Sequence, residues 1–462
     1  MKSSCRTRLT LIILVVLATL SPLAAISFYP EMQLEDPFSS TLLLEDRDFF
    51  FETDVAYRAA ADNLQISLTT MGKGDPLYVW FGHSGLVVTD LRSGRSVMYD
   101  YGIFSFDDDF YQTFALGRLS YEVWATSAQA RYDLAREEDR TVSEITLDLP
   151  ASAKIELVNF LNYNIAPENN TYLYHHYDEN CSTRIRDIID KAVDGQLKAW
   201  ATETPLDMTI RDLVTLHTAN SPFIDWTLNY LQSGSIDHPI SLWEAMFLPK
   251  VLERALLEFT YTSLDGSVVP LVTDRRTIHT ASEGRRPPVA QQPVSVTLPA
   301  FLASLGLALL SIFTGHILSE SRFKTIRTLG KSVYGVITTV WTAAIGILST
   351  LLVFMMFVSN HDVTYFNENF LISSPWLLVM SVQVLRGLFG NTVSERRFRR
   401  ANTILAVAVI SLSIVKAVLY DVLIQDNWQI ILTLLPLYLA NSSIPFEKLV
   451  SRFSFRADDS DW

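Results

Sequence analysis

Cysteine is nearly absent from this chain, which contains two in 462 residues. Cys5 precedes the first hydrophobic segment, whereas Cys181 lies in the long polar region that follows it. The composition therefore excludes a scaffold held by a network of disulfides. Secreted domains usually pair their cysteines or lack them, so a single one such as Cys181 is a candidate reactive thiol.

Positive charge is also scarce, because 50 acidic residues outnumber 37 basic ones and give a formal net charge of −13 at pH 7. The acidic excess lies in residues 29–297, which we interpret as a solvated surface. Nucleic-acid phosphates require a basic face, so a nucleic-acid partner is excluded. Metal-binding patterns are missing too. His175 and His176 are adjacent and have no spaced partner, and we expect neither a metal nor another cofactor.

Long apolar runs, by contrast, are present: one at the N-terminus and five in residues 298–444. The first, Leu9 to Phe28, follows three basic residues and predicts a signal peptide or an N-terminal membrane anchor in residues 1–28. Five more stretches predict an all-α transmembrane bundle of about five helices in residues 298–444, although the last is short for a span. They are Leu298–Leu318, Ser332–Ser359, Leu371–Gly390, Thr403–Leu423 and Trp428–Asn441.

Basic residues gather in the loops after the first, third and fifth stretches, and acidic residues in the two loops between. Basic loops remain in the cytoplasm, which orients every loop consistently. We therefore predict a multi-pass protein of the cell (inner or cytoplasmic) membrane. It has an extracytoplasmic domain at 29–272, a linker at 273–297 and a cytoplasmic tail at 445–462. Lys416, inside the fourth stretch, is expected to extend outwards or to pair with Asp421, with a functional role as the alternative.

The sequence around His83 and Cys181 carries the pattern of thiolate chemistry. A lone cysteine with a distant histidine is the minimal signature of a cysteine nucleophile. Residues 77–81, 86–90 and 96–101 have the composition of strands. With a two-residue turn at Ser93 and Gly94, Val87 pairs with Asp100, and His83 and Asp100 share one face. A register shift of one residue would replace Asp100 by a neighbouring tyrosine.

Helical composition is found at residues 127–140 and 151–165, while residues 55–71 stay unassigned. A further helix is predicted at residues 182–193 with Asn180 as its N-cap. Cys181 then lies at a helix N-terminus, whose partial positive charge lowers the pKa of a thiol. The amphipathic stretch Ile240–Tyr261 is interrupted by Pro249 and is expected to pack in the core or to lie on the bilayer.

Several motifs, in this order, resemble the extracytoplasmic domain of the bacterial Lnb family, the lipoprotein intramolecular transacylases. The motifs are Gly82-His83-Ser84-Gly85, Tyr99-Asp100-Tyr101-Gly102 with Phe104 and Phe106, Phe110 with Phe114 and Gly117, Asp178 to Asp187, and Trp243 to Pro249. The resemblance covers roughly residues 55–260. The chain order of histidine before cysteine also resembles circularly permuted papain-like (NlpC-like) enzymes, including lecithin:retinol acyltransferase. This implies an α+β permuted papain-like fold for the extracytoplasmic domain.

The resemblance also implies roles for individual residues. Cys181 would be the nucleophile, His83 the general base, and Asp100 the group that orients His83. The backbone N–H groups of Cys181 and Ser182 are expected to stabilise an oxyanion. Binding or structural roles are expected for the motif residues Asn180, Ser182, Arg184, Tyr101 and Tyr177.

The reaction that the resemblance implies is acyl transfer on a bacterial lipoprotein, with membrane lipid as the other partner. An acyl chain would move from the diacylglyceryl group of the lipoprotein, through a thioester with Cys181, to the α-amine of its N-terminal cysteine. The product is a lyso-form lipoprotein. Two alternatives stay open: a papain-like cysteine hydrolase (a cell-wall peptidase or a lipase) and a non-enzymatic membrane scaffold. The sequence predicts no oligomeric state.

Overall fold

The computed structural model describes residues 60–104, 110–293, 295–419 and 421–443. The predicted signal peptide or anchor, the cytoplasmic tail and Phe106 lie outside these residues. The chain forms two compact units. The sheet unit comprises the described residues up to 220 together with residues 239–292, and the helical unit comprises residues 221–238 with the described residues from 293 onwards.

The sheet unit is built on a seven-stranded sheet in which every neighbouring pair is antiparallel. The strand order is β6-β4-β3-β2-β1-β5-β9. The strands are β1 (Leu64–Met71), β2 (His83–Asp90), β3 (Arg95–Ile103), β4 (Ser120–Ser127), β5 (Val142–Leu147), β6 (Thr171–Leu173) and β9 (Val272–His279). A separate pair consists of β7 (Thr260–Thr262) and β8 (Val268–Pro270).

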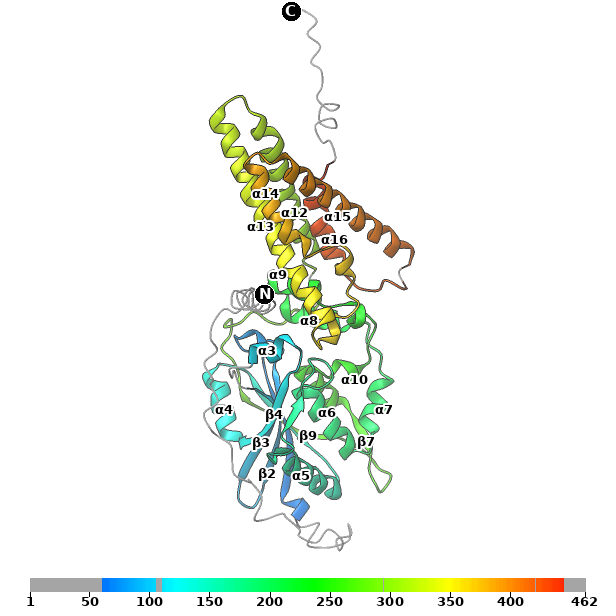
Figure 1. Ribbon diagram of the computed structural model, residues 1–462. Coiled ribbons are helices and arrows are strands. Elements are labelled where there is room, and N and C mark those ends of the chain that lie inside the picture. The colour runs from blue at the N-terminus through cyan, green and yellow to red at the C-terminus, as the bar shows by residue number, and fades with distance from the viewer. Residues whose placement is uncertain (1–59, 105–109, 294, 420, 444–462) are drawn as a thin grey trace, which may run out of the picture. The chain divides into compact units, whose positions relative to one another are not determined.

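Helices cover both faces of this sheet, so the predicted mixture of helix and strand is confirmed (Figure 1). One face packs its apolar side chains against α5, α6 and α11 in the main core, and the other packs against α4. The helices of this unit are α3 (Phe110–Ala115), α4 (Ala128–Glu137), α5 (Ala151–Ile165), α6 (Cys181–Ala192), α7 (Gln196–Thr202), α8 (Ile210–Thr218), α10 (Leu242–Ala245) and α11 (Pro249–Glu258).

The hairpin that carries the candidate site differs from the prediction in its register. Four residues, not two, connect β2 and β3, because the Asp90 carboxylate accepts hydrogen bonds from the Arg92 N–H and the Ser93 hydroxyl and so closes a wider turn. Asp100 therefore pairs with Gly85 rather than with Val87. The error is two residues, and side chains alternate with a period of two. His83 and Asp100 consequently still share a face.

One further strand prediction is corrected, and a segment left unassigned is now placed. Residues 77–81, predicted as a strand, contain a 3-10 turn at Leu77–Val79 whose first two side chains are about half exposed. Residues 64–71, part of the unassigned segment 55–71, form the interior strand β1, which lies between β2 and β5. The amphipathic stretch Ile240–Tyr261 forms α10 and α11, and its apolar side chains are buried in the core rather than free to lie on a bilayer.

The predicted linker at 273–297 begins inside the sheet unit, because β9 pairs with β5 along its length. Its arginines, which suggested an exposed linker, neutralise carboxylates. Arg275 pairs with the buried Glu253, Arg276 pairs with the buried Glu144, and Arg286 pairs with Asp75. Buried carboxylates require such partners, so the arginines belong to the fold.

The helical unit contains four helices that are long and apolar enough to cross a membrane, among the residues that the structure describes. The fifth predicted stretch forms a helix of 13 residues, so the expected bundle of about five spans is corrected to four with a shorter fifth helix. The principal helices are α12 (Thr297–Ile312), α13 (Lys324–Phe357), α14 (Trp376–Leu388), α15 (Thr392–Val418) and α16 (Trp428–Ala440).

Residues 221–238, predicted within the extracytoplasmic domain, pack in the helical unit instead. They contain α9 (Pro222–Leu231) and a 3-10 turn at Gly234–Ile236. Tyr230 is fully buried, and its hydroxyl forms hydrogen bonds with Ser349 (3.0 Å) and Ser373 (2.6 Å). The Trp226 indole donates to Thr433 (3.2 Å). The aromatic side chains of α9 thus join the core of the helical unit.

Lys416 forms a buried ion pair with Glu368 (2.6 Å), neither extending outwards nor pairing with Asp421. Its ammonium also donates to the carbonyl oxygens of Leu423 and Gln425. The second oxygen of Glu368 accepts the Gln425 N–H (3.1 Å). These contacts satisfy both charges, as a buried pair requires.

Candidate active site

Cys181 is the first residue of α6, and its neighbours fix the start of this helix. The Asn180 side chain accepts hydrogen bonds from the backbone N–H groups of Ser182 (2.8 Å) and Thr183 (3.0 Å). Thr183 Oγ1 in turn accepts one from the Asn180 N–H (2.8 Å). The predicted N-cap is therefore confirmed, and Cys181 lies at the positive end of the helix dipole.

His83, the first residue of β2, connects Cys181 to a buried chain of charges. The His83 ring interacts with the Cys181 thiol and forms a hydrogen bond, through Nε2, with Asp100 Oδ1. The other Asp100 oxygen lies 2.7 Å from the guanidinium of Arg131, which α4 contributes. The side chains of Asp100 and Arg131 are 1% and 5% exposed. Helices from opposite faces of the sheet thus supply the thiol and the guanidinium.

These charges determine the protonation of the site. Burial opposes a charge on His83, but Asp100 and Cys181 outweigh it and raise the pKa of His83 to about 10. Burial likewise opposes a charge on the thiol, yet His83 and the backbone of Ser84 lower the pKa of Cys181 below its ordinary value. Against the same burial, Arg131 and then His83 lower the pKa of Asp100 to about 2. These shifts favour a thiolate paired with an imidazolium over a neutral thiol and a neutral imidazole.

Alkylation tests this pairing directly. In a chain that also carries Cys5→Ser, iodoacetamide should modify Cys181 rapidly at pH values well below the ordinary thiol pKa. In His83→Ala, burial is opposed only by the Ser84 backbone and the thiol pKa rises, so the rate should begin to fall at a higher pH as the medium is acidified. Near pH 6.5 the variant should react about tenfold more slowly, once the weaker nucleophilicity of a low-pKa thiolate is included. Identical pH profiles, measured by mass spectrometry of the Cys181 peptide, would contradict the ion pair.

The expected oxyanion donors are partly corrected. The Ser182 N–H donates to Asn180 and is already occupied, whereas the Cys181 N–H is not among the groups that Asn180 binds. A second buried donor lies nearby, since the Tyr172 hydroxyl has no hydrogen-bond partner among the described residues. Burial raises the pKa of Tyr172, so this hydroxyl remains protonated and able to donate.

Gly102 brings these groups together. Its φ of +89° lies in the left-handed region that favours glycine. A Cβ atom at this position would lie 3.6 Å from Cys181 Cβ and 3.9 Å from Tyr172 Oη. The same point is 3.8 Å from the ring of Tyr174. Gly102 therefore lies where Cys181, Tyr172 and Tyr174 approach one another.

An aromatic surface extends from Tyr174. Its ring stacks on Tyr121 with centroids 4.2 Å apart, Tyr121 stacks on Phe104 (5.0 Å), and Phe104 meets the edge of Tyr78 (5.5 Å). Such a row of rings provides apolar contact next to a thiol.

The other predicted site residues have mainly positioning contacts. The Ser182 hydroxyl forms a hydrogen bond with Ser84 (3.0 Å), which joins α6 to β2. Arg184 pairs with Glu179 (2.7 Å) and lies over the ring of Tyr172 (4.5 Å). Tyr177 packs against Phe247 in an edge-to-face contact.

Arg131 is the residue that the sequence analysis missed. It lies in a helix that was predicted, but nothing in the local sequence links that helix to Asp100. A buried aspartate in a predicted strand does require a cationic partner, and that requirement was the available signal. Within the described ranges, no group of three or more His, Cys, Asp or Glu side chains is placed to hold a metal ion.

Comparison of the sequence with known protein families finds a match to one family model. Residues 53–215 match the model of the Lnb N-terminal periplasmic domain. Neither the curated proteins nor the solved structures contain a match to the chain. The predicted resemblance is therefore confirmed for this part of the chain, which contains His83, Asp100, Arg131 and Cys181. The chain accordingly combines a region that matches the Lnb N-terminal periplasmic domain with, among its described residues, four helices long and apolar enough to cross a membrane.

Proposed function

We propose that this Lnb-domain protein is a membrane-bound, thiol-dependent acyltransferase. It moves an acyl chain from the diacylglyceryl group of a bacterial lipoprotein to the α-amine of the lipoprotein's N-terminal cysteine. The supporting observation is the chain of contacts from the Cys181 thiol through His83 and Asp100 to Arg131. The histidine strand precedes the cysteine helix in the chain, which is the order of a permuted papain-like enzyme, and we propose that fold for the domain.

The first half-reaction forms a thioester. The Cys181 thiolate attacks the carbonyl carbon of the sn-2 ester, and the carbonyl oxygen becomes an oxyanion. When the intermediate collapses, the bond to the glyceryl oxygen breaks, and the His83 imidazolium gives its proton to that leaving oxygen. Asp100, held ionised by Arg131, orients the His83 ring and stabilises its charged form. The products are a Cys181 thioester, a neutral His83 and a lyso-glyceryl group.

The second half-reaction transfers the chain to nitrogen. The neutral α-amine of the substrate cysteine attacks the thioester, and His83 accepts the proton that the amine loses. The bond to sulfur then breaks and restores the thiolate and the imidazolium. Two donors are suited to the oxyanion in both steps: the Cys181 N–H and the Tyr172 hydroxyl, which lies near the thiol without a partner.

The surroundings suit a lipid substrate. The aromatic row from Tyr174 to Tyr78 provides an apolar surface for an acyl chain, and an apolar surface also excludes the water that would hydrolyse a thioester. Membrane attachment keeps the enzyme beside substrates that are themselves anchored, which replaces a search in solution by proximity. The loop charges favour the cytoplasmic membrane of a bacterium with the C-terminus inside.

Mass spectrometry of a lipoprotein N-terminal peptide tests the function. Cells that make the intact protein should yield an N-acylated monoacylglyceryl peptide. Cells that make Cys181→Ala should yield a diacylglyceryl peptide with a free amine, because no thioester can form. Cys5→Ser is the matched control and should behave like the intact protein. A lyso-peptide without an N-acyl chain would indicate a lipase, and identical peptides from all three strains would overturn the proposal.

A further inference from the structure

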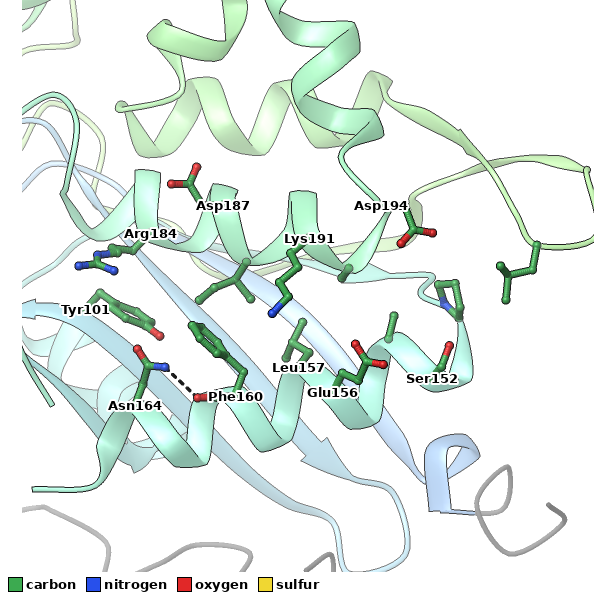
Figure 2. Close-up of a pocket in the computed structure, with 15 residues that line it drawn as sticks. Tyr101, Ser152, Glu156, Leu157, Phe160, Asn164, Arg184, Asp187, Lys191 and Asp194 are labelled. Carbon is green, nitrogen blue, oxygen red and sulfur yellow. Dashed lines mark hydrogen bonds between the residues drawn. The ribbon is translucent and has the colours of Figure 1, made fainter. Parts of the chain in front are cut away.

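A groove runs along α6, starting one helical turn beyond Cys181. It encloses about 560 Å³ between α5 and α6, with Tyr101 of β3 at one end and Asp194 near the other (Figure 2). None of the reaction steps above uses this space. Its volume falls within the range typical of ligand sites in proteins.

The groove continues the face of α6 that carries the thiol. Arg184, Ile188 and Lys191 line it and follow Cys181 by three, seven and ten residues. Positions spaced in this way lie on one side of a helix. The groove therefore begins one helical turn from Cys181, at Arg184.

One end of the groove contains an unused hydrogen-bond donor. Tyr101 is 1% exposed, and its hydroxyl has no hydrogen-bond partner among the described residues. Figure 2 shows this hydroxyl beside Asn164 on the groove side of the sheet. Burial raises the pKa of Tyr101, so the group is protonated and can donate. A buried polar group without a partner is costly, and a ligand atom that accepts from Tyr101 would remove that cost.

The lining of the groove selects among ligand classes. Lys191 lies over the ring of Phe160 (5.5 Å), and carboxylates from Glu156, Asp187 and Asp194 surround the remaining space. An acyl chain would leave these polar groups unpaired. An anionic lipid headgroup would meet more carboxylates than cations. A polypeptide has alternating backbone donors and acceptors and side chains of either charge. It can therefore pair with the polar groups of the groove and place a cation beside the carboxylates.

We propose that this groove binds the polypeptide segment that follows the acylated cysteine of the substrate, which rests on the acyltransferase function proposed above. The lengths agree. Along α6 the distance from Cys181 to Lys191 is about 15 Å, given a rise of about 1.5 Å per residue. An extended peptide covers that distance in four to five residues, at about 3.3–3.6 Å each. The carboxylates at the far end should favour a basic residue there.

Purified full-length protein and synthetic diacylglyceryl-cysteine substrates test the proposal. One substrate ends at the cysteine amide, and two others continue for five residues with either Lys or Glu at the fourth and fifth positions. We expect the Lys peptide to have a KM about tenfold lower than that of the short substrate, equivalent to about 1.4 kcal/mol. The Lys peptide should be preferred over the Glu peptide about threefold, as expected for partly exposed charge pairs.

The double variant Glu156→Gln/Asp194→Asn should abolish the preference for Lys over Glu. Asparagine tolerates the left-handed conformation of Asp194 (φ 53°). The control Glu168→Gln/Glu203→Gln removes two exposed carboxylates elsewhere and should keep the preference. The preference is a ratio within one preparation, so partial misfolding does not alter it. Equal KM values for all substrates, or a preference unchanged in the groove variant, would overturn the groove and leave the acyltransferase intact. Transfer from none of the substrates would overturn the acyltransferase, and the groove with it.

Discussion

Replacing Asp100 with Asn is expected to lower kcat for acyl transfer by about 10²- to 10⁴-fold, the range seen when the carboxylate of a catalytic triad is neutralised. The variant keeps the size of the side chain but removes the charge that stabilises the His83 imidazolium. It also leaves the buried guanidinium of Arg131 without its counter-charge. KM should change little, because Asp100 is not expected to contact the substrate.

The pH profile separates this positioning role from a merely structural one. The reactive pair exists between the thiol pKa, which sets the acidic limit, and the His83 pKa, which sets the alkaline limit. Asp100 and the thiolate hold the alkaline limit at about 10. In Asp100→Asn, burial opposes the imidazolium with less compensation, so the alkaline limit should fall towards or below the ordinary histidine value. Activity of the variant should then decline across a range in which the intact protein is constant. A variant that loses rate without any shift of the alkaline limit would show that Asp100 acts through folding alone.

Arg131 provides a graded comparison. Arg131→Lys retains a positive charge near Asp100 and should retain more activity than Arg131→Met, which leaves the buried Asp100 carboxylate with His83 as its remaining charged partner. Equal activities for the two variants would mean that the charge of Arg131 has no part in the function of the site.

Replacing Lys416 with Met should destabilise the helical unit by about 3–5 kcal/mol, the usual cost of removing one partner from a buried ion pair. Glu368 would remain buried with its charge and only its neutral donors. In Lys416→Met/Glu368→Gln no charge is left, and most of the stability should return. Lys331→Met removes an exposed cation from α13 and should have little effect.

Unfolding in detergent micelles measures these changes in the free energy of unfolding. The stability of the double variant relative to Lys416→Met decides whether Lys416 acts by neutralising Glu368 or by packing. A double variant as unstable as Lys416→Met would show that the lysine acts through packing rather than by neutralising Glu368. The structural role has a clear physical basis. Gln425 donates to the carbonyl oxygen of Gln232 (3.0 Å) and to the side chain of Asn367 (3.2 Å), and it contacts both members of the ion pair. The pair thus organises the contacts that hold the segment 221–238 in the helical unit.

The local features of the site were predictable from the sequence, because short-range chemistry determines them. Asn180 followed by a helical run predicts a cap, and the cap places Cys181 at the start of a helix. The shared face of His83 and Asp100 survived a wrong register, since the error was an even number of residues. The tyrosines near Cys181 were visible, but the sequence could not show which hydroxyls would be buried without partners.

Contacts between distant elements account for what was missed. Arg131 reaches Asp100 from a helix on the opposite face from α6, and no spacing rule connects the two positions. Residues 77–81 have strand composition but no partner strand, because β1 occupies the place beside β2. The arginines of β9 suggested a linker, since their buried partners Glu144 and Glu253 lie far away in the sequence. In each case the decisive contact is long-range, which composition and periodicity do not report.

The placement of residues 221–238 has a consequence for how the protein can be divided. Within the described residues the chain passes between the two units at 220–221, at 238–239 and at 292–293. A single cut at any one of these points leaves the units covalently joined through the other two. A fragment that ends at residue 220 lacks α11 and β9 of the sheet unit. A fragment that ends at residue 292 contains Trp226 and Tyr230 without the helical core that buries them. The units are therefore threaded together rather than joined in series, and neither corresponds to one continuous stretch of the gene.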